Sequence, residues 1–586
     1  MQANSGSNSL SALNQGLQPA LAGESKEKIR EELLRQEAEV VSVLLQLRSR
    51  INALSPLDRL PPEILSIIFE HLACSSYYDD IIPLDYWDRL KTPARNRQLF
   101  VITHVCRRWR EVSLNVAGLW KRANDFTPNR IDTFLERSRD ATISLHLQVE
   151  RIGTLTQFLA KCGHRLKHLD ITLHALHLLH LPSLQTFRTP NLESLTIVSE
   201  AELPVQVSDR EPVLFCDHIS SLKALAIDPA HICIPTNEFP HLTHLYLAKF
   251  SSPILSGDII ARLLELLSNT PALQYLHIEG LDHNASRTVA TRTASLHSLR
   301  GLTCGGGDLQ SALCLLSILD VPADVTIRMD RVKCLTPNHI ALVKPLPCQG
   351  FLASFTRLEI TAAYDDLHLI ADGPRSGLWI QADCAHDHQW DEWLARLCTM
   401  FPLPSVTTLL ASAVDRRIIP SLLRQLPRLT TVAVYIRAGP LDERENAPSA
   451  SHELASSLYA ALADTELPQL EVLALGAKAA HPDKLSPADL VSMVAARSGR
   501  GRPLQRLDID LIDFWPDRHA RYPVALDVDL FQAAFAPAAE HVEALQLFKN
   551  AGVCHFELRE MWTMPEAERY WNMPEESIPF YRLYWH

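Results

Sequence analysis

The chain has 586 residues, of which 47% are hydrophobic and 21% charged, so the composition is that of a folded protein and leaves little room for disorder. This length exceeds what one hydrophobic core serves, and we expect at least two folding units or one elongated array. The formal net charge of -12 at pH 7 disfavours nucleic acid and anionic membranes as partners.

The cysteine pattern and the N-terminal sequence bear on the cellular compartment. The 12 cysteines are scattered and form no CxxC pair, which favours a reducing compartment over a disulfide framework. The first residues lack the basic and apolar regions of a secretory signal, and no apolar run is long enough to span a bilayer. We therefore expect a cytoplasmic or nuclear protein that does not bind membranes.

The N-terminal segment divides into a tail and a helix. Residues 1–23 are rich in Ser, Asn, Gln, Ala and Gly without an apolar period, which predicts a disordered tail. Residues 24–55 are rich in helix formers, with an apolar edge at alternating steps of four and three: Val40, Leu44, Leu47, Ile51 and Leu54. This edge fits a homodimer seam through residues 24–54 or packing against the next segment, and packing is the simpler interpretation.

Residues 56–124 are predicted to form a small helical domain with two apolar helix faces. The first lies in LPPEILSIIFEHL and the second in VITHVCRRWREV, and each repeats apolar residues at helical spacing. The segment between them, at about residues 74–97, is polar, aromatic and broken by proline, so we expect an exposed loop.

From about residue 140 to residue 550 a motif L-x-x-L-x-L recurs, first at steps typical of leucine-rich repeats and later at longer ones. Copies begin at Leu166, Leu192, Leu222, Leu242, Leu273, Phe355, Leu429, Leu470, Leu504 and Val542, with weaker relatives at Leu299 and Val406. DVTIRM and GLWIQA are expected to be further strands, and the spacers 258–269 and 452–464 to be helices.

This motif predicts short strands that point alternate leucines into one elongated core. We therefore expect an α + α/β protein: an N-terminal helix and a helical domain, followed by an irregular leucine-rich-repeat-like α/β solenoid. The asparagine usual after the last leucine is absent, so the repeats are irregular, and a doubly wound sheet is the alternative.

The two early helices resemble an F-box, the segment by which substrate receptors of Skp/cullin/F-box ubiquitin ligases bind the Skp adaptor subunit. The L-P-x-E-[IL] opening matches at Leu60, Pro61, Glu63 and Ile64, and V-C-[RK]-x-W-R matches at Val105, Cys106, Arg107, Trp109 and Arg110. The insertion at 74–97 departs from the compact family pattern. The order of helix, F-box and irregular repeats is similar to the large sets of F-box proteins in mushroom-forming fungi.

The resemblance implies a non-catalytic substrate-recognition adaptor that binds the Skp adaptor and, through it, cullin. The residues implied in Skp binding are Leu60, Pro61, Ile64, Leu65, Ile68, Phe69, Leu72, Val105, Cys106 and Trp109. A small domain this apolar cannot cover its surface alone, which favours a partner, although the same face also suits packing within the chain.

The repeat domain would then bind a target protein. In the repeat register, polar and aromatic residues flank the inward leucines on the concave face: His168, Asp170, His244, Tyr246, Tyr275, His277, Glu279, Arg357, Glu359, Arg506, Asp508 and Asp510. The aromatic-rich segment 551–586 is expected either to cap the last repeat or to close over a bound target.

No enzyme motif is evident, and we expect no cofactor and no metal. Cys384, His386 and His388 have zinc-ligand chemistry, but no second pair of ligands follows at suitable spacing. Two other functions stay open: a scaffold that binds the Skp adaptor outside a ligase, and an enzyme on an irregular α/β fold whose site is assembled from distant residues.

Overall fold

The computed structural model divides the chain into two compact units. Unit 1 comprises Met1–Asp79, Pro93–Arg122 and Asp132–Ala141, and unit 2 comprises Asp80–Thr92, Ala123–Ile131 and Thr142–His586. The residues that the structure describes are 25–74, 82–84, 97–124, 128–149, 152–173, 186–199, 213–217, 219–230, 233–250, 259–281, 293–334, 349–363, 366–384, 390–413, 418–436, 450–464, 467–478, 482–512, 528–549, 551, 559–562 and 564–572. Among these, no helix combines the length and hydropathy needed to cross a membrane.

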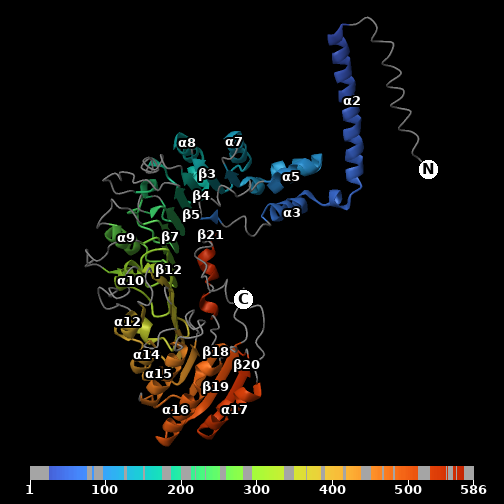
Figure 1. Cartoon of the computed structure of the whole chain (residues 1–586). Helices are drawn as coiled ribbons and strands as arrows, with labels where there is room; N and C mark the ends of the chain where they lie inside the picture. The colour runs from blue at the N-terminus through green and yellow to red at the C-terminus, as the bar shows by residue number, and fades with distance from the viewer. Residues whose placement is uncertain are drawn as a thin grey trace, which may run out of the picture. The chain divides into compact units, whose positions relative to one another are not determined.

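Unit 1 is helical (Figure 1). Its elements are α2 (Lys26–Ala53), η1 (Pro56–Arg59), α3 (Pro62–Cys74), α5 (Arg97–Val105), α6 (Arg107–Asn115), η2 (Ala117–Trp120) and the end of α7 (Pro128–Arg137). The sequence predicted one helix over α5 and α6, and this is wrong at Cys106. The backbone there is extended, and the Cys106 thiol accepts a hydrogen bond from the Trp109 amide, so a new helix begins.

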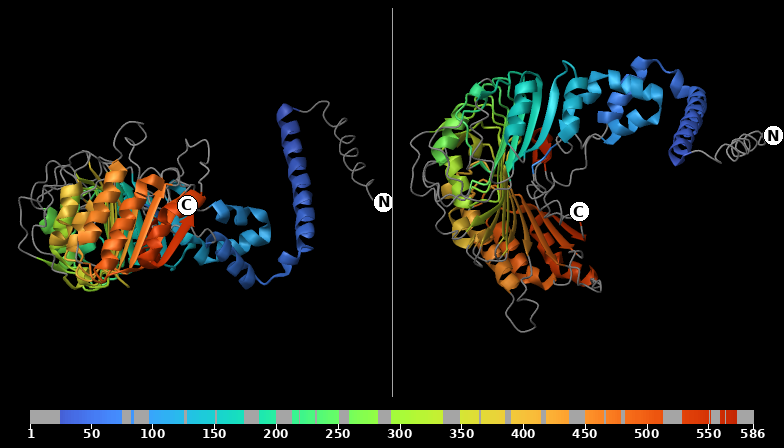
Figure 2. Two further views of the ribbon diagram at one scale, coloured as in Figure 1. Left: turned by 60° about the horizontal axis from the view of Figure 1, so that its bottom comes forward. Right: turned by 90° about the horizontal axis from the view of Figure 1, so that it is seen from above.

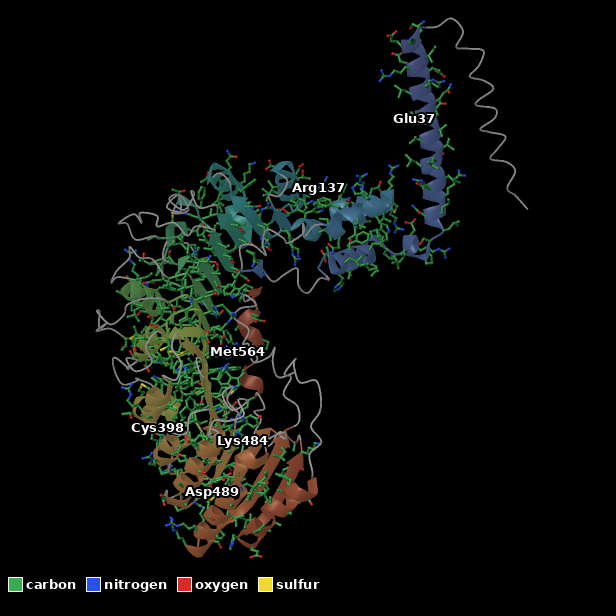
Figure 3. The ribbon with its side chains drawn as sticks, viewed as in Figure 1. Glu37, Arg137, Cys398, Lys484, Asp489 and Met564 are labelled. Atoms are coloured by element: carbon green, nitrogen blue, oxygen red, sulfur yellow. The ribbon has the colours of Figure 1, made fainter. Side chains whose placement is uncertain are left out.

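Aromatic side chains form the core of unit 1. Phe69 on α3 is fully buried and packs against Trp109 of α6, with ring centroids 4.8 Å apart. Trp120 is also buried, and its indole donates to the Ser113 carbonyl at 2.9 Å. Arg137, labelled in Figure 3, lies 4.4 Å above the Trp120 ring. These contacts join α3, α6, η2 and α7 around one small core.

Unit 2 is built on a large, mostly parallel sheet, in which most strands pair with the next strand in the sequence. Its strands are β3 (Ile143–Val149), β4 (Leu166–Leu173), β5 (Ser194–Ser199), β6 (Ala224–Asp228), β7 (His244–Ala248), β8 (Tyr275–Glu279), β10 (Gly301–Gly305), β12 (Thr326–Cys334), β13 (Arg357–Ala363), β14 (Asp366–Asp372), β15 (Gly377–Cys384), β16 (Thr408–Ala413), β17 (Thr431–Ile436), β18 (Val472–Lys478), β19 (Leu504–Ile512) and β20 (Val542–Lys549). Every recurring leucine motif thus coincides with a strand, and the strands expected at DVTIRM and GLWIQA are confirmed as β12 and β15.

One part of the sheet departs from this sequential order. Strand β12 pairs with β15 rather than β13, and β13 pairs with β16, so β13, β14 and β15 lie in reverse order. Strand β14 is antiparallel to both of its neighbours. The leucine motif did not reveal this meander, because β14 carries no copy of it.

The helices of unit 2 lie on one face of the sheet (Figures 1 and 2). The α-helices are α8 (Ile152–Cys162), α9 (Ile259–Ser268), α10 (Leu309–Ser317), α11 (Gln349–Ala353), α12 (Trp390–Ala395), α13 (Leu397–Met400), α14 (Ile418–Gln425), α15 (Ala450–Asp464), α16 (Pro487–Gly499) and α17 (Val528–Phe535). The spacers predicted as helices are confirmed as α9 and α15.

Short elements complete unit 2. They are β9 (Ala294–Ser295), β11 (Leu319–Asp320), η3 (Gly163–Arg165), η5 (Phe215–Asp217), η9 (Pro482–Leu485), η10 (Ala536–Glu540), η11 (Glu560–Trp562) and η12 (Pro565–Glu568). Strand β2 (Arg122–Asn124) lies where the two units meet in the sequence.

The leucines form continuous rows across the sheet. Leu195, Leu225, Leu245 and Leu276 are register partners on β5 to β8, and each is at least 98% buried. Because side chains alternate along a strand, the residues between these leucines point to the opposite face. The opposite face is therefore where the predicted target-binding residues lie.

Part of the segment predicted as an exposed loop is instead folded into unit 2. Strand β1 (Ile82–Pro83) pairs in parallel with β21 (Trp571–Asn572), and Leu84 is buried against Trp571. The prediction was wrong here because the partner of this short strand lies at the far end of the sequence, where no local pattern reveals it.

Candidate functional site

Neighbouring strands bring several of the predicted target-binding residues together. In the register of β7 and β8, His244 is the partner of Tyr275 and Tyr246 is the partner of His277. The Tyr246 and His277 rings stack with centroids 4.8 Å apart and planes at 11°. The Tyr246 hydroxyl donates to the Glu279 carboxylate at 2.7 Å. These five residues form what we call the aromatic cluster.

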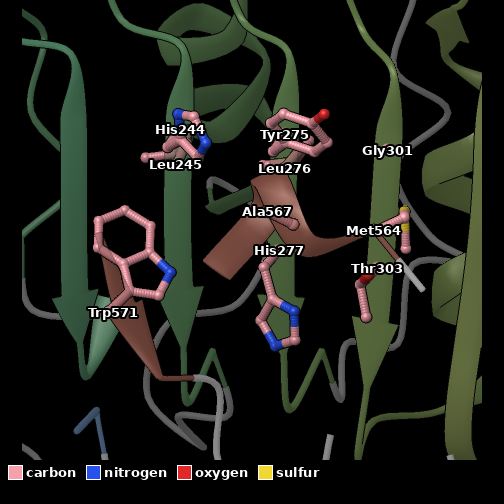
Figure 4. Close-up of a pocket in the computed structure, with 10 residues that line it drawn as sticks. All are labelled: His244, Leu245, Tyr275, Leu276, His277, Gly301, Thr303, Met564, Ala567 and Trp571. Carbon is pink, nitrogen blue, oxygen red and sulfur yellow. The ribbon is translucent and has the colours of Figure 1, made fainter. Parts of the chain in front are cut away.

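A C-terminal segment covers this cluster. We define the C-terminal strap as the described residues 559–562 and 564–572, which lie across the face of the sheet opposite the leucine rows (Figures 1 and 4). Trp571 is buried against Ala224, Ala226 and Tyr246 of β6 and β7. Trp562 is buried against Ile370 and Trp379 of β14 and β15.

Small residues on the sheet make room for the strap. A Cβ atom added to Gly377 would lie 2.5 Å from Cζ2 of Trp562, and one added to Gly301 would lie 2.9 Å from Sδ of Met564. The small side chains of Ala224 and Ala226 likewise leave room for the indole of Trp571, which packs against them. The strap follows a track of glycine and alanine, on which larger side chains would displace it.

Polar contacts fix the strap at both ends. Nε2 of His244 lies 2.8 Å from the carbonyl oxygen of Glu566. Nε2 is the donor of this hydrogen bond, because a carbonyl oxygen can only accept. Arg559 donates to the Gly373 carbonyl, and its guanidinium lies 3.5 Å from the Asp372 carboxylate. The Tyr570 ring meets His244 edge to face, with centroids 4.9 Å apart. Backbone carbonyls thus accept several of these bonds, so the polar contacts depend only partly on side-chain identity.

A small cavity remains between the strap and the cluster (Figure 4). Its volume of about 10 Å³ holds roughly one water molecule. It is lined by His244, Leu245, Tyr275, Leu276, His277, Gly301, Thr303, Met564, Ala567 and Trp571. Both ring nitrogens of His277 are buried without a hydrogen-bond partner, although a neutral imidazole has one donor and one acceptor.

Burial controls the charge of this face. Burial, together with the smaller effect of the nearby Arg328 charge, lowers the pKa of His277 to about 3. Burial also lowers the pKa of His244, and it raises the pKa of Asp330 despite the Arg328 guanidinium 3.3 Å away. Both histidines beneath the strap are therefore neutral near pH 7.

The remaining predicted target-binding residues lie on other strands of the same sheet. Asp170 on β4 is buried and pairs with His146 of β3, and His168 is its neighbour on the same face. Arg506 on β19 pairs with Asp508 at 3.0 Å, and Asp510 is fully buried. Arg357 and Glu359 lie on β13, next to the strand that receives Trp562. The structure does not bring these residues into the aromatic cluster.

Sequence reasoning missed the residues of the strap and its glycine track. The aromatic content of the tail was a signal, but the segment was expected to cap the last repeat or close over a target. Its described part instead lies on β6, β7, β14 and β15, and the last strand of the large sheet, β20, has no fully buried residue. Residues 573–586 lie outside the described ranges.

Unit 1 has a separate apolar surface. The docking face, as we name it, consists of aliphatic side chains that are 43–59% exposed: Ile64, Ile67, Leu72, Val101 and Val105. Of the residues implied in Skp binding, Leu65 and Phe69 are buried, so they form the core beneath this face. Leu60, Ile68, Cys106 and Trp109 are partly buried, and Pro61 is exposed.

Two further observations bear on function. Within the described ranges no three metal-ligating side chains lie close enough to hold an ion; Cys384 is buried on β15, and His386 and His388 fall outside these ranges. Comparison with known proteins finds no family model that matches the chain and no matching curated protein.

Proposed function

We propose that this protein is a substrate-recognition adaptor of a Skp/cullin/F-box ubiquitin ligase. Unit 1 would bind the Skp adaptor, unit 2 would bind a target protein, and the other subunits would supply the ubiquitin chemistry. The observation that carries the proposal is the docking face, whose five exposed aliphatic side chains lie on the helices that bear the F-box-like motifs.

Burial of this face would provide substantial binding energy. Because these side chains are already about half buried, each contributes about 1 kcal/mol when the rest of it leaves water, before the cost of association. The contact between buried Phe69 and partly buried Trp109 holds α3 against α6, so the docking face is preorganised. An exposed apolar face of this kind on a small unit is typical of a protein interaction site.

For unit 2 we propose an irregular leucine-rich-repeat-like solenoid that acts as the target receptor. Sequential parallel pairing and helices on one face support this fold. The aromatic cluster supports the binding role, because Tyr and His side chains are effective anchors at protein interfaces. Such an adaptor would act by positioning, which raises the effective concentration of target lysines near the conjugating enzyme.

We also propose that two copies associate through α2. The helix has no buried residue, and its aliphatic edge includes Leu44, Leu47 and Ile51, each 44–58% exposed. Among the described residues, none covers this edge, which is where the sequence favoured packing within the chain. The spacing of four and three residues is self-complementary and suits a short coiled coil.

Co-purification of the full chain with the Skp adaptor and cullin tests the ligase proposal. We expect the wild type to bring down both partners and the triple variant Ile64→Ala, Ile67→Ala, Val105→Ala to lose both while staying folded. Leu45→Ala on α2 removes an equally exposed aliphatic side chain and serves as the matched control. Adaptor binding without cullin would favour a scaffold outside a ligase, and no binding by the wild type would overturn the proposal.

A further inference from the structure

The C-terminal sequence contains a short repeat, and the described residues include the tryptophan of each copy. W-x-M-P-E occurs at Trp562–Glu566 and again at Trp571–Glu575. Each tryptophan begins one copy, and each is buried on the same face of the sheet at a separate place. The sheet therefore has two receptor positions for an indole, one on β6 and β7 and one on β14 and β15.

The fit between the strap and the sheet is incomplete at one point. Both nitrogens of His277 are buried without partners, as is the indole Nε1 of Trp571, which also lines the cavity. The other strap residues at the cavity, Met564 and Ala567, offer no polar side-chain group. Figure 4 shows Ala567 beside His277 in this cavity. Because an unsatisfied buried polar group lowers stability, a polar side chain at this point of the strap would hold it more firmly on the sheet than Met564 and Ala567 do.

The contacts of the strap resemble those of a bound peptide. It contributes two aromatic anchors in small-residue tracks, a backbone carbonyl to His244, and one guanidinium to the buried Asp372. Buried aromatic anchors and main-chain hydrogen bonds are both used in peptide recognition. Apart from the two-residue pairing of β21 with β1, the described strap joins no strand ladder.

From these observations we infer that the strap is an internal occupant of the target site, and that the targets are peptide segments with two tryptophans at the spacing of Trp562 and Trp571. Such a target would carry a polar side chain at the position of Ala567, where it pairs with His277. This inference rests on the proposed receptor role of unit 2 and names the class of target. The strap would then compete with targets for the face.

The test uses the full chain and a labelled synthetic peptide of residues 559–572. In the wild type the tethered strap has an effective concentration of about 1 mM, which weakens peptide binding roughly 100-fold if its own Kd is about 10 μM. The double variant Trp562→Ala, Trp571→Ala vacates the face, so we expect it to bind the peptide. A peptide with both tryptophans replaced by alanine should bind at least about tenfold more weakly.

Two additions make the test specific to this face. Gly377→Val in the vacated chain fills the indole position of Trp562, on β14 and β15, and should weaken peptide binding about tenfold. A peptide with Ala567→Asn supplies a donor and an acceptor for His277, and should bind about two- to tenfold more tightly than the unchanged peptide. No binding by the folded double variant, or binding that Gly377→Val leaves unchanged, would overturn the inference.

Should the double variant not fold, hydrogen exchange of the wild type decides the question. If the strap detaches from the sheet, its backbone amides in residues 564–572 should exchange faster than the amides of β7 and β8. Equal exchange rates would overturn the inference. Adaptor binding is read separately: the double variant should still co-purify with the Skp adaptor. Loss of adaptor binding in the wild type, with peptide binding retained by the double variant, would refute only the ligase proposal.

Discussion

Trp571 packs against Tyr246, with ring centroids 6.4 Å apart and planes at 60°, although the two residues lie far apart in the sequence. Tyr246 is only 1% exposed as a result of this and neighbouring contacts. A residue that the sequence places on an open binding face is thus covered by the end of the same chain. Access to the aromatic cluster therefore depends on how firmly the strap is held.

Replacement of Trp571 by alanine should loosen the strap. Truncation of a buried tryptophan lowers the free energy of unfolding by about 3–5 kcal/mol. For Trp571→Ala this is an upper limit, because the strap can detach locally while the sheet stays folded. We expect faster proteolysis of the C-terminal segment and a lower unfolding midpoint in denaturant. Trp571→Phe keeps an aromatic ring and should lose about half as much. Unchanged proteolysis in Trp571→Ala would contradict the contacts described.

A substitution on the sheet should displace the strap from below. Gly377→Ala places a Cβ atom 2.5 Å from Cζ2 of Trp562, closer than real contacts allow, so the indole must move. We expect a destabilisation of about 1–3 kcal/mol and a red-shifted tryptophan emission. Gly499→Ala, with no atom within 4 Å of the added Cβ, is the matched control. The double variant Gly377→Ala, Trp562→Ala should lose less than the sum of the single losses, and simple additivity would refute the clash.

The stability of unit 2 should fall between pH 6.5 and pH 3 because of His277. Its pKa is about 3 in the fold, against 6.5 for an ordinary histidine, so between these values the unfolded chain binds a proton that the folded chain does not. Stability therefore decreases as the pH falls, by about 2 kcal/mol at pH 5. The carboxylate oxygen of Glu279 lies 4.0 Å from Nε2 of His277. This distance is too long for a hydrogen bond that would keep a proton on the His277 ring.

His277→Gln removes this titration, and urea unfolding at pH 7 and pH 5 measures the difference. The variant should lose about 2 kcal/mol less than the wild type over this interval. His297→Gln, at an exposed position, should behave like the wild type. An equal loss in wild type and His277→Gln would show that His277 is accessible to protons in the fold.

Much of the sheet followed from the sequence because its signals are local. A leucine motif needs only its own residues to predict a strand, and the copies at Leu222 and Leu242 became β6 and β7. The alternation of side chains likewise placed Tyr246 and His277 on one face before any pairing was known. The faces of α3 and α5 were predictable for the same reason, as helical spacing is a local property.

The features that depend on distant partners could not be predicted in this way. Strand β1 pairs with β21 across almost the whole sequence, and two residues carry no recognisable strand pattern. The burial of Leu65 and Phe69, against the exposure of Ile64 and Ile67, depends on how α6 crosses α3. Motif matching alone assigned the buried and exposed residues to one surface.

The difference between buried and exposed side chains on α3 gives a further prediction. Phe69→Ala should destabilise the unit by about 3–5 kcal/mol, because the ring is fully buried against Trp109. Ile67→Ala, at a side chain that is 51% exposed, should change stability by no more than about 0.5 kcal/mol. Thermal unfolding of both variants checks this, and a large loss in Ile67→Ala would mean that the docking face is covered within the chain.

The last prediction concerns α2, whose 28 residues include no buried side chain. Its first half carries intrahelical ion pairs, with Arg35 bonded to Glu32 and Glu39, whereas its second half carries the aliphatic edge. An isolated helix has little stability in water, so we expect the aliphatic edge of α2 to pack against a partner. The spacing of Leu44 and Ile51 suits a coiled coil with a second copy of α2.

Light scattering on the full chain tests this association. The wild type should have twice the mass of the 65.8 kDa chain, and Leu44→Asp, Ile51→Asp should have the mass of one chain, because two carboxylates in an apolar seam cannot be buried. Leu45→Asp lies off the seam and should stay dimeric. A wild type with the mass of one chain at all concentrations would contradict the dimer, and adaptor binding by the variant would show that the two interfaces of unit 1 act independently.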